Sequence, residues 1–426
     1  NDVVVEDGVV TGAVGWNLED EEPVTIAANA VIIAAGGLTR LYQRNSASVN
    51  MNGDGYAMAL RAGAELIDME FPQFFPIGHL APRLVGMDPI MWDPFRYKLG
   101  GRLFNAEGEE FLHRYGGEDA EKYTTTRDII SYGITKENEA GRATENGGVH
   151  LSFQHIPEEK LREAFGPVID KLAANGIDLT KDTVEVSPIA HYHMGGIRVN
   201  GKMETNVAGL YGAGEVVGGA NGANRLSGNA IPEAFVFGER AGRFAAEYAR
   251  GRNRAWSEAA ATEHIDRLNG LVARQSDNAN DPAALGEIWF ELQKLMWENV
   301  GVLRTGDKLD AALARIREMR AALDAIVPAA DTAFNMTLQD WYDLRSALLT
   351  AESVTLAAIN RTESRGAHQR EDFEPMDPAQ EPNQRLRPAP DGAPGSGYLP
   401  VAPGTAACRS RAPTAPNPPR APPTPA

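Results

Sequence analysis

Three motifs close together decide the fold: HYHMGG at residues 191–196, GLYGAGE at 209–215 and GANRLSGN at 222–229. Apolar residues flank the glycines, and a helix is expected to follow, with Asn229 as its N-cap and Pro232 in its first turn. A strand that passes through a glycine turn into a helix is typical of nucleotide-binding α/β folds, and the start of such a helix favours an anionic ligand. The stretch therefore predicts an α/β fold with a ligand site at this helix start.

Composition excludes several function classes. The chain has 426 residues, 43% of them hydrophobic, which is enough for two or three domains with cores of their own. A net charge of -17 argues against a nucleic-acid partner. The single cysteine, Cys408, leaves no internal disulfide and no cysteine-ligated iron–sulfur cluster. Because no run of about 18 apolar residues is present, we expect a cytoplasmic protein that reaches a membrane only through partner subunits.

Changes of pattern along the chain divide it into regions. Strand-like runs fill the first 70 residues and include an apolar run at 30–35, which is typical of a strand buried on both faces. Scattered aromatics with one clear helix, expected over 157–174, indicate an inserted domain. Apolar residues at three- and four-residue spacing predict helices over 258–274, 284–302, 308–326 and 338–360. The expected regions are 1–70 and 188–252 for a split nucleotide-binding domain, 71–187 for a capping domain, 256–372 for a helical domain and 375–426 for a disordered, Pro- and Ala-rich tail.

The glycine turns are candidates for a cofactor site. Gly212, Gly214 and Gly218 approximate a dinucleotide fingerprint, but the spacing departs from it, and such glycines also serve tight packing of a strand on a helix. Glu215 follows a strand end, where a carboxylate can accept hydrogen bonds from ribose hydroxyls. The helix that starts with the amides at 230 and 231 would stabilise an anionic ring at its positive end.

His191 and Arg225 are the candidates for binding an anionic substrate. They lie on either side of the glycine turn and could clamp a dicarboxylate, because an Arg fork matches a carboxylate with two hydrogen bonds. The alternatives are a hydrogen-bonded core His and an Arg that ties down a loop carbonyl. Strand alternation places His193 on the same face as His191, so at most one of them needs a ligand role. From composition alone, Arg127 and Asp128 would be an ordinary surface ion pair.

The motifs resemble those of the flavoprotein subunit of fumarate reductase and succinate dehydrogenase, from about residue 3 to about residue 373. The landmarks are Ala35-Gly36-Gly37, Gly53-Asp54-Gly55, Gln73-Phe74, Arg127-Asp128, the His191 motif, the Arg225 loop and residues 296–305 and 361–368. The resemblance implies an α/β architecture: a split Rossmann-like FAD-binding domain, an inserted α+β capping domain and a C-terminal helical bundle.

The resemblance also implies roles for single residues. In similar proteins a hydride passes between flavin N5 and one alkene carbon of fumarate, and an arginine matching Arg127 delivers the proton to the other carbon. His191, the first residue of the family's His-Tyr-x-Met-Gly-Gly pattern, and Arg225 would hold the carboxylates of a dicarboxylate-like substrate. FAD would be the cofactor, and an iron–sulfur subunit would carry the electrons. The candidates for binding FAD are Gly36, Gly37, Asp54, Glu215, Ala230 and Ile231.

The chain departs from the family pattern at three places. Phe75 replaces a substrate-binding His in the usual Gln-Phe-His-Pro segment, which makes one end of the pocket more apolar. The usual Thr-Glu pair is lost, with Asp93-Pro94 about where it should fall. The family's first strand, Gly-rich phosphate loop and flavin-linking His segment do not precede residue 1. We therefore expect a fragment whose Pro-rich tail replaces the family's C-terminal segment, through a reading-frame error.

Three functions remain open from the sequence. The first is interconversion of fumarate and succinate, or of a relative with a less polar end. The second is the activity of an L-aspartate oxidase-like flavoprotein, whose electrons go to oxygen or another carrier. The third is a non-catalytic fragment that keeps the helical bundle and cap as an interaction surface and holds no flavin.

Overall fold

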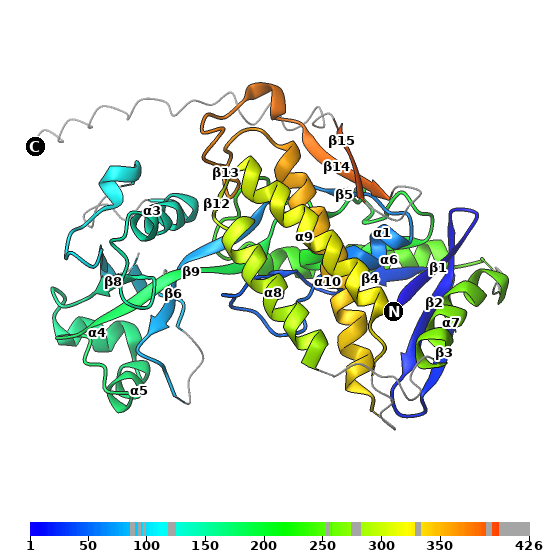
Figure 1. Cartoon of the computed structure of the whole chain (residues 1–426), viewed down its shortest axis with the longest axis horizontal. Coiled ribbons are helices and arrows are strands. Elements are labelled where there is room, and N and C mark those ends of the chain that lie inside the picture. Colours follow the sequence, from blue (N-terminus) through cyan, green and yellow to red (C-terminus); the bar gives the residue numbers. More distant parts are fainter. Residues whose placement is uncertain are drawn as a thin grey trace, which may run out of the picture.

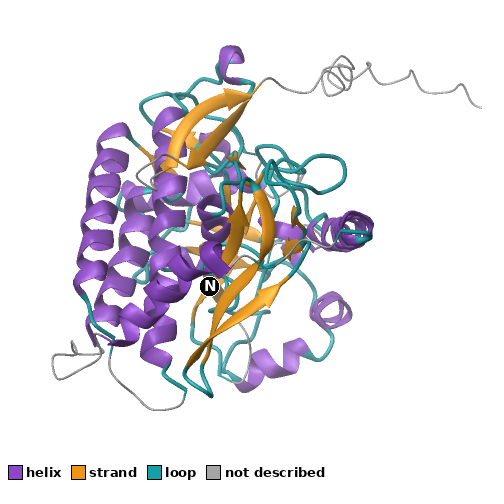
Figure 2. Cartoon of the chain, turned by 90° about the vertical axis from the view of Figure 1, so that its right-hand side faces the viewer, coloured by secondary structure: helices purple, strands orange, loops and turns teal. Residues whose placement is uncertain are grey.

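The computed structural model of the chain describes residues 1–85, 90–92, 95–96, 99–117, 125–252, 256, 258–273, 283–328, 334–388 and 394–399. A mixed lobe lies at the left of Figure 1, long helices cross the middle, and a strand-rich region holds the N-terminus at the right. In Figure 2 the long helices form one layer beside the strands. No helix in the described part of the chain is long and apolar enough to cross a membrane.

The N-terminal region combines an antiparallel meander with a short parallel sheet. The meander consists of β1 (Asp2–Glu6), β2 (Val9–Asn17) and β3 (Glu22–Ala27). Strand β4 (Val31–Ile33) pairs in parallel with β11 (Leu210–Gly212), which lies almost two hundred residues further along the chain. The expectation that the 30–35 run is buried on both faces is wrong, because Ile32 is 40% exposed. Helices α1 (Asp54–Arg61) and α6 (Ala230–Ala249) belong to this region.

The left-hand lobe has its own sheet and its own core. Strands β6 (Pro72–Ala81), β9 (Thr183–His193), β8 (Val149–Ser152) and β7 (Arg102–Phe104) lie side by side in that order. Helices α3 (Arg127–Glu139), α4 (Glu158–Phe165) and α5 (Val168–Ala174) complete it. The predicted single helix over 157–174 is wrong: Gly166 at φ 51° and Pro167 separate two helices. Helix α3 was missed by the sequence pattern.

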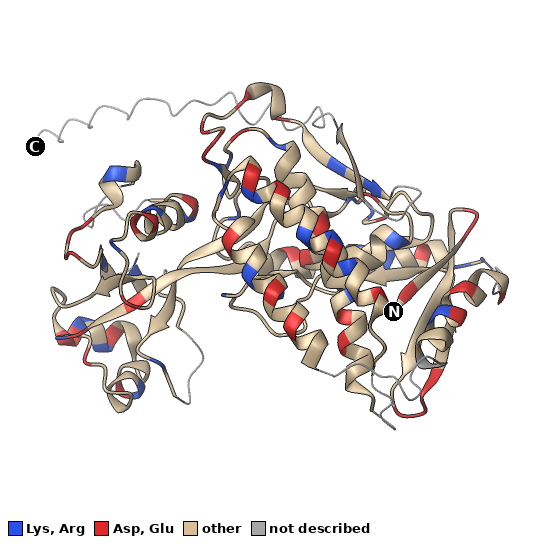
Figure 3. Ribbon diagram, in the orientation of Figure 1, with Lys and Arg blue, Asp and Glu red and all other residues tan. Residues whose placement is uncertain are grey.

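The central layer matches the periodicity of the sequence. Helices α7 (Glu258–Ala273), α8 (Ala283–Asn299), α9 (Gly306–Ala325) and α10 (Met336–Asn360) agree with the four predicted helices to within three residues at each end. Asn335 caps α10, since its side chain accepts the Leu338 N–H at 2.9 Å. Figure 3 shows acidic and basic residues interspersed on the outer faces of these helices, as expected for their solvated sides.

Short elements connect the regions. The 3-10 turns are η1 (Thr39–Leu41), η2 (Leu112–Tyr115), η3 (Gly214–Val216) and η4 (Pro378–Gln380). Strands β12 (Leu303–Arg304) and β13 (Gln369–Arg370) form a parallel pair next to the start of α9. A four-stranded sheet has the order β10 (Gly196–Ile197), β5 (Leu66–Ile67), β14 (Asn383–Pro388) and β15 (Pro394–Leu399).

This last sheet corrects the prediction of a disordered tail from residue 375. Strand β14 pairs with β5, and Leu386 is 1% exposed. The Gln384 N–H donates to Asp68 at 3.1 Å, and its side chain donates to the Ala357 carbonyl at 2.9 Å. A few buried contacts thus order a segment whose overall composition favours disorder. The rest of the predicted tail, residues 400–426 with Cys408, lies outside the described residues.

Burial of the Asp68 carboxyl makes the stability of the protein depend on pH. Burial, and then the neighbouring Glu70, raise the pKa of Asp68 to about 7. A carboxyl with a raised pKa favours its protonated form in the folded state. Its contribution to stability is therefore complete below the ordinary carboxyl pKa and is lost as the pH rises from about 4 to about 7.

Asp68→Asn should remove this loss. At each pH the free energy of unfolding of the variant is compared with that of the wild type. We expect this difference to be more favourable to the variant at pH 8 than at pH 5, by about 1 to 2 kcal/mol. The backbone tolerates the change, because Asp68 has φ 56°, a conformation in which Asn is common. Urea unfolding at the two pH values measures the effect, and an equal shift at both would contradict it.

Candidate active site

The side chains of Arg127, Phe75 and His191 meet between helix α3 and the four-stranded sheet of the left-hand lobe. Phe75 lies in β6 and His191 in the neighbouring β9, and their rings meet edge to face with centroids 5.2 Å apart. The guanidinium of Arg127, the first residue of α3, lies 4.8 Å from the centre of the Phe75 ring. Since Arg127 is 8% and Phe75 2% exposed, this end of the site excludes water.

Arg225 provides a second buried guanidinium close to the first. It lies 4.3 Å from the centre of the Tyr192 ring and is 5% exposed. Burial and then the positive charge of Arg127 lower the pKa of Arg225. Its Nε atom is buried and has no hydrogen-bond partner among the described residues. A buried, unpartnered N–H on a cation fits an anionic ligand, because leaving it unsatisfied costs free energy.

Gln73 connects the two arginines. Its Nε2 donates to the Arg225 carbonyl at 2.7 Å and to Asn224 Oδ1 at 2.9 Å, while Arg127 Nη1 donates to its Oε1 at 3.4 Å. Asn224 in turn donates to Asp128 at 2.9 Å. The alternative of an ordinary surface pair at 127 and 128 is therefore wrong: Arg127 is buried and Asp128 bonds to the Arg225 loop.

The two histidines of the 191–196 motif have different environments. His191 is half-buried, its Nδ1 lies 2.8 Å from Ser46 Oγ, and burial followed by Arg225 and Arg127 lowers its pKa to about 4. The ring is therefore neutral at pH 7. His193 is 0% exposed, its Nε2 lies 3.1 Å from the Met69 carbonyl, and it packs against Tyr56. His193 is the core histidine of the pair.

The void beside Gln73 is too small for a dicarboxylate. A void lined by Gln73, Asn224 and Asp128 has a volume of about 10 Å³, which holds one water molecule at most.

The glycine turns at 36–37 and 212–215 lie next to each other. Strands β4 and β11 are parallel, so their carboxyl ends reach the same edge, where α/β sheets bind nucleotides. The approach is close: a Cβ atom on Gly37 would lie 2.1 Å from Glu215 Oε1. The Glu215 carboxylate accepts the His193 N–H at 3.0 Å, and burial raises its pKa to about 7. The glycines and this carboxylate fit a nucleotide cofactor at that edge.

Helix α6 begins at Ala230 as predicted, but its first turn differs from the prediction. Asn229 makes no side-chain cap hydrogen bond, so the predicted Asn cap is wrong. Glu233 instead places a carboxylate in the first turn, where the helix dipole favours it. It accepts hydrogen bonds from the Tyr192 hydroxyl at 2.8 Å and from Asn221 at 2.6 Å. Ile231 is 67% exposed.

Asp54 lies apart from the other cofactor candidates. It is in the first turn of α1, and Ser346 and Asp343, which face its side chain, belong to α10. Burial and then Asp343 raise its pKa to about 6. The structure thus brings Gly37 together with Glu215, and Arg127 together with Phe75, His191 and Arg225, but it directs the Asp54 side chain toward α10. The Asp93-Pro94 segment lies outside the described residues.

Sequence reasoning missed several residues that position this site. Ser46 bonds to His191 across 145 residues of sequence, and a lone Ser in a loop carries no local signal for such a contact. The Arg225 guanidinium packs on the Tyr192 ring, and the Tyr192 hydroxyl donates to Glu233. In the sequence both residues looked like ordinary strand and helix residues. Gln73 stands in a quoted landmark, yet nothing in the sequence showed that it joins both arginines.

Comparisons with known proteins agree with this architecture. The FAD binding domain family model matches residues 1–231, and the model for the C-terminal part of fumarate reductase flavoproteins matches residues 290–385. A fumarate reductase (CoM/CoB) subunit from Methanothermobacter marburgensis is 38% identical over 371 residues, which cover 87% of this chain and 66% of the relative. L-aspartate oxidase of Yersinia pestis is 31% identical, covering 85% of this chain and 64% of that protein.

A solved structure supports the same conclusion. A mutant quinol fumarate reductase of Escherichia coli aligns with a TM-score of 0.83 and 32% identity, covering 94% of this chain and 70% of that chain. The two family models and this alignment place the chain in the class of FAD-binding flavoproteins, with the expected α/β fold and helical C-terminal region. The chain belongs to the family of fumarate reductase and succinate dehydrogenase flavoprotein subunits. It spans just under two thirds of the length of the Methanothermobacter marburgensis relative.

Proposed function

We propose that the chain belongs to an enzyme that interconverts fumarate and succinate, or a related unsaturated and saturated carboxylate. The observation that supports this most is the pair of buried guanidinium groups, Arg127 and Arg225, beside the neutral His191. Two fixed positive charges at a water-poor site match a dianion. The reduction consumes two electrons and two protons per alkene, and oxidation returns them.

The chain's own residues would divide the work as follows. Arg225 offers its free Nε–H to one substrate carboxylate, and His191 offers a ring N–H while Ser46 fixes the ring. Arg127, held against the Phe75 ring, would hand a proton to the alkene carbon. FAD, when bound at the Gly37 and Glu215 edge, supplies or accepts the electrons as a hydride.

An arginine acid needs a neighbour that disfavours its charged form. The free pKa of arginine exceeds about 12, so proton release at neutral pH is difficult. Arg225 is a second cation near Arg127, and both arginines lower the pKa of His191. A bound dianion would develop negative charge during reduction, and the two arginines would stabilise that charge.

Partners and location follow from the same proposal. The electrons would pass to an iron–sulfur subunit, because such a cluster needs several cysteine ligands and the 426 residues contain a single cysteine. The relative from Methanothermobacter marburgensis is itself named as one subunit of its enzyme. Any membrane attachment would be peripheral and would come through partner subunits.

A second candidate is an L-aspartate oxidase-like activity. The 31% identity to that enzyme, close to the 32% shared with the quinol fumarate reductase, supports keeping it. Oxygen consumption distinguishes the two. Peroxide formation with L-aspartate and no reduction of fumarate would favour the oxidase.

A visible spectrum followed by a reduction assay tests the proposal. The purified chain, incubated with FAD and desalted, should keep the absorption band of oxidised flavin at roughly 450 nm. It should then oxidise reduced viologen dye when fumarate or another unsaturated dicarboxylate is added. A chain that stays colourless after incubation would overturn the proposal for this polypeptide and favour the non-catalytic fragment.

Phe75 determines the preferred substrate in this proposal. It stands where the family pattern has a histidine, and its ring contacts both His191 and Arg127. Phe75→His should raise kcat/KM for fumarate by about tenfold, since a hydrogen bond to a charged carboxylate is worth roughly 1.5–3 kcal/mol. Steady-state rates with fumarate and with a monocarboxylic enoate measure the change. A loss with both substrates would show that Phe75 serves packing.

A further inference from the structure

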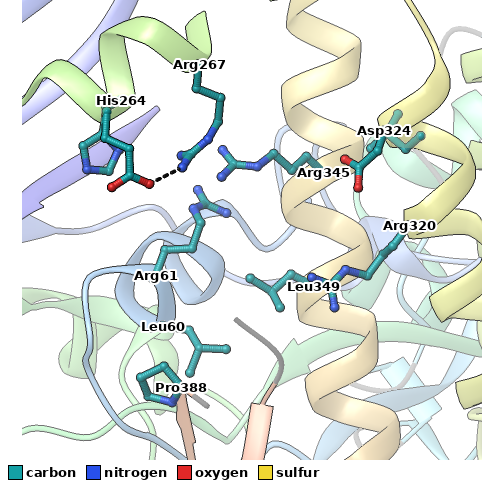
Figure 4. A pocket seen from close by; sticks show the side chains of 11 residues that line it. Leu60, Arg61, His264, Arg267, Arg320, Asp324, Arg345, Leu349 and Pro388 are labelled. Carbon is teal, nitrogen blue, oxygen red and sulfur yellow. Dashed lines mark hydrogen bonds and ion pairs between the residues drawn. The ribbon is translucent and has the colours of Figure 1, made fainter. Parts of the chain in front are cut away.

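A second arginine-rich site lies far from the candidate active site. A cavity of about 460 Å³ opens between α1, α7, α9 and α10, on the side of the molecule opposite α3 in Figure 1. Its polar wall contains Arg61, Arg267, Arg320 and Arg345, which come from four different helices. Figure 4 shows the guanidinium groups of Arg61, Arg267 and Arg345 turned toward one another.

One buried carboxylate faces three of these arginines. Asp2, with a side chain 7% exposed, lies 2.5 Å from Arg61 Nε, 3.3 Å from Arg345 Nη1 and 3.7 Å from Arg267 Nη1. His264 Nδ1 lies 3.6 Å from the same carboxylate. Arg267 has a further pair in Glu263, which is 81% exposed and therefore contributes little. Three guanidinium groups thus share one desolvated negative charge.

The cluster has unused hydrogen-bonding capacity. Arg61 Nη1 is buried without a hydrogen-bond partner among the described residues. Burial lowers the pKa of Arg61, and the nearby Arg345 lowers it further. Arg320 is occupied by Glu352, and the acidic residues that line the cavity are Glu263 and Asp324. Such an arrangement costs free energy unless an anion joins it.

The remaining walls indicate the size and kind of ligand. Leu60, Leu349 and Pro388 form an apolar side of the cavity, and its volume lies within the range of small-molecule sites. A wider opening of about 660 Å³ shares Arg267 and Arg345 with it and gives a path from outside. Guanidinium forks match the oxygens of a phosphate group with paired hydrogen bonds.

We propose that this cavity binds a small organic phosphate, with its phosphate group among Arg61, Arg267 and Arg345 and its less polar part against Leu60, Leu349 and Pro388. The arginines come together from four helices although the chain as a whole carries a net charge of -17. The site requires neither flavin nor turnover, so it stands independently of the proposed function.

Isothermal titration of the whole chain at low salt tests the proposal with three probes: pyrophosphate, inorganic phosphate and ADP. We expect saturable one-to-one binding of ADP and pyrophosphate, with ADP the tighter because it also meets the apolar wall. Arg345→Gln and Arg267→Gln should each weaken ADP binding about tenfold, the loss typical of a charged hydrogen bond. Arg243→Gln, on the exposed face of α6, should change it less than twofold.

Two readouts keep the result decisive if a variant unfolds. Arg267 has a side chain 36% exposed, so its removal should leave the melting temperature nearly unchanged, and this variant carries the test if Arg345→Gln is unstable. ADP should raise the melting temperature of the wild type and not that of Arg267→Gln. No binding of any probe, or equal affinity in Arg267→Gln, would overturn the proposal.

Discussion

Replacing Arg127 by Gln should lower kcat for fumarate reduction by about a thousandfold, within the range found when a positioned acid or charge is removed. The reason is the geometry around the side chain. Arg127 is 8% exposed, held by Gln73 on one side and by the Phe75 ring on the other. Gln fills similar space and keeps a hydrogen-bond donor, but it has no charge and cannot release a proton.

The split between kcat and KM distinguishes proton delivery from substrate holding. If Arg127 delivers the proton, kcat falls while KM changes by less than about threefold, because the lost interaction acts only in the transition state. Arg225→Gln should instead raise KM strongly, since Arg225 has the unpartnered Nε that a carboxylate would use. Arg127→Lys keeps the charge but not the fork, and should recover little of the rate.

Arg162→Gln is the matched control, because this arginine lies on α4 of the same lobe with a side chain 53% exposed. It should leave kcat within about twofold of the wild type. Flavin content, measured for every variant, corrects the rates for bound cofactor. An Arg127→Gln enzyme that retained a tenth of the wild-type kcat would remove Arg127 from the proton pathway.

The sequence predicted those parts of the structure whose signals are local or periodic. Helices α8 to α10 followed from apolar spacing, because each buries a continuous stripe, as Leu292 and Met296 do in α8. The parallel pairing of β4 with β11 needed the resemblance, because the two strands are distant in the chain. The same holds for the meeting of Arg127 with His191, since strand β9 and helix α3 carry no signal for each other.

The predictions that were wrong concern features that depend on particular contacts and not on a local or periodic pattern. Strand β14 is ordered by contacts such as Gln384 with Asp68, which composition averages cannot show. Asn229 leads a helix but makes no cap, since Glu233 already supplies a carboxylate in the first turn. In the first case a tertiary contact overrode a sound local pattern, and in the second a carboxylate in the same helix turn did so.

Arg361→Leu should lower the free energy of unfolding by about 3 to 5 kcal/mol, the cost of leaving a buried charge without its partner. Arg361 is 1% exposed and forms ion pairs with Glu70 and, at 2.9 Å, with Glu363; both carboxylates are fully buried. It also donates to the carbonyls of Gln380 and Pro382, so it ties the end of α10 to the segment that leads into β14. Leu supplies bulk but leaves the buried Glu70 carboxylate without its ion-pair partner, whereas Glu363 keeps its pair with Arg365 at 2.6 Å.

An exposed arginine gives the control for this experiment. Arg315 on α9 pairs with Glu291 at 2.6 Å and with Glu318 at 2.7 Å, but its side chain is 44% exposed. Because exposed pairs are worth about 0.2–1 kcal/mol, Arg315→Leu should shift the urea midpoint only slightly. Equal midpoints for the two variants would show that solvent reaches the Arg361 network in the folded protein.

A second change separates the buried charge from the lost packing. In the Arg361→Leu background, Glu70→Gln should restore part of the stability, because it neutralises the buried carboxylate that has lost its ion-pair partner. In the wild-type background the same change should be destabilising, since Arg361 then loses a charged partner. A double-mutant cycle on urea midpoints measures this coupling. Additive effects would mean that Arg361 acts through its hydrocarbon stem against Phe71, whose ring centre lies 5.1 Å from the guanidinium, and not through its charge.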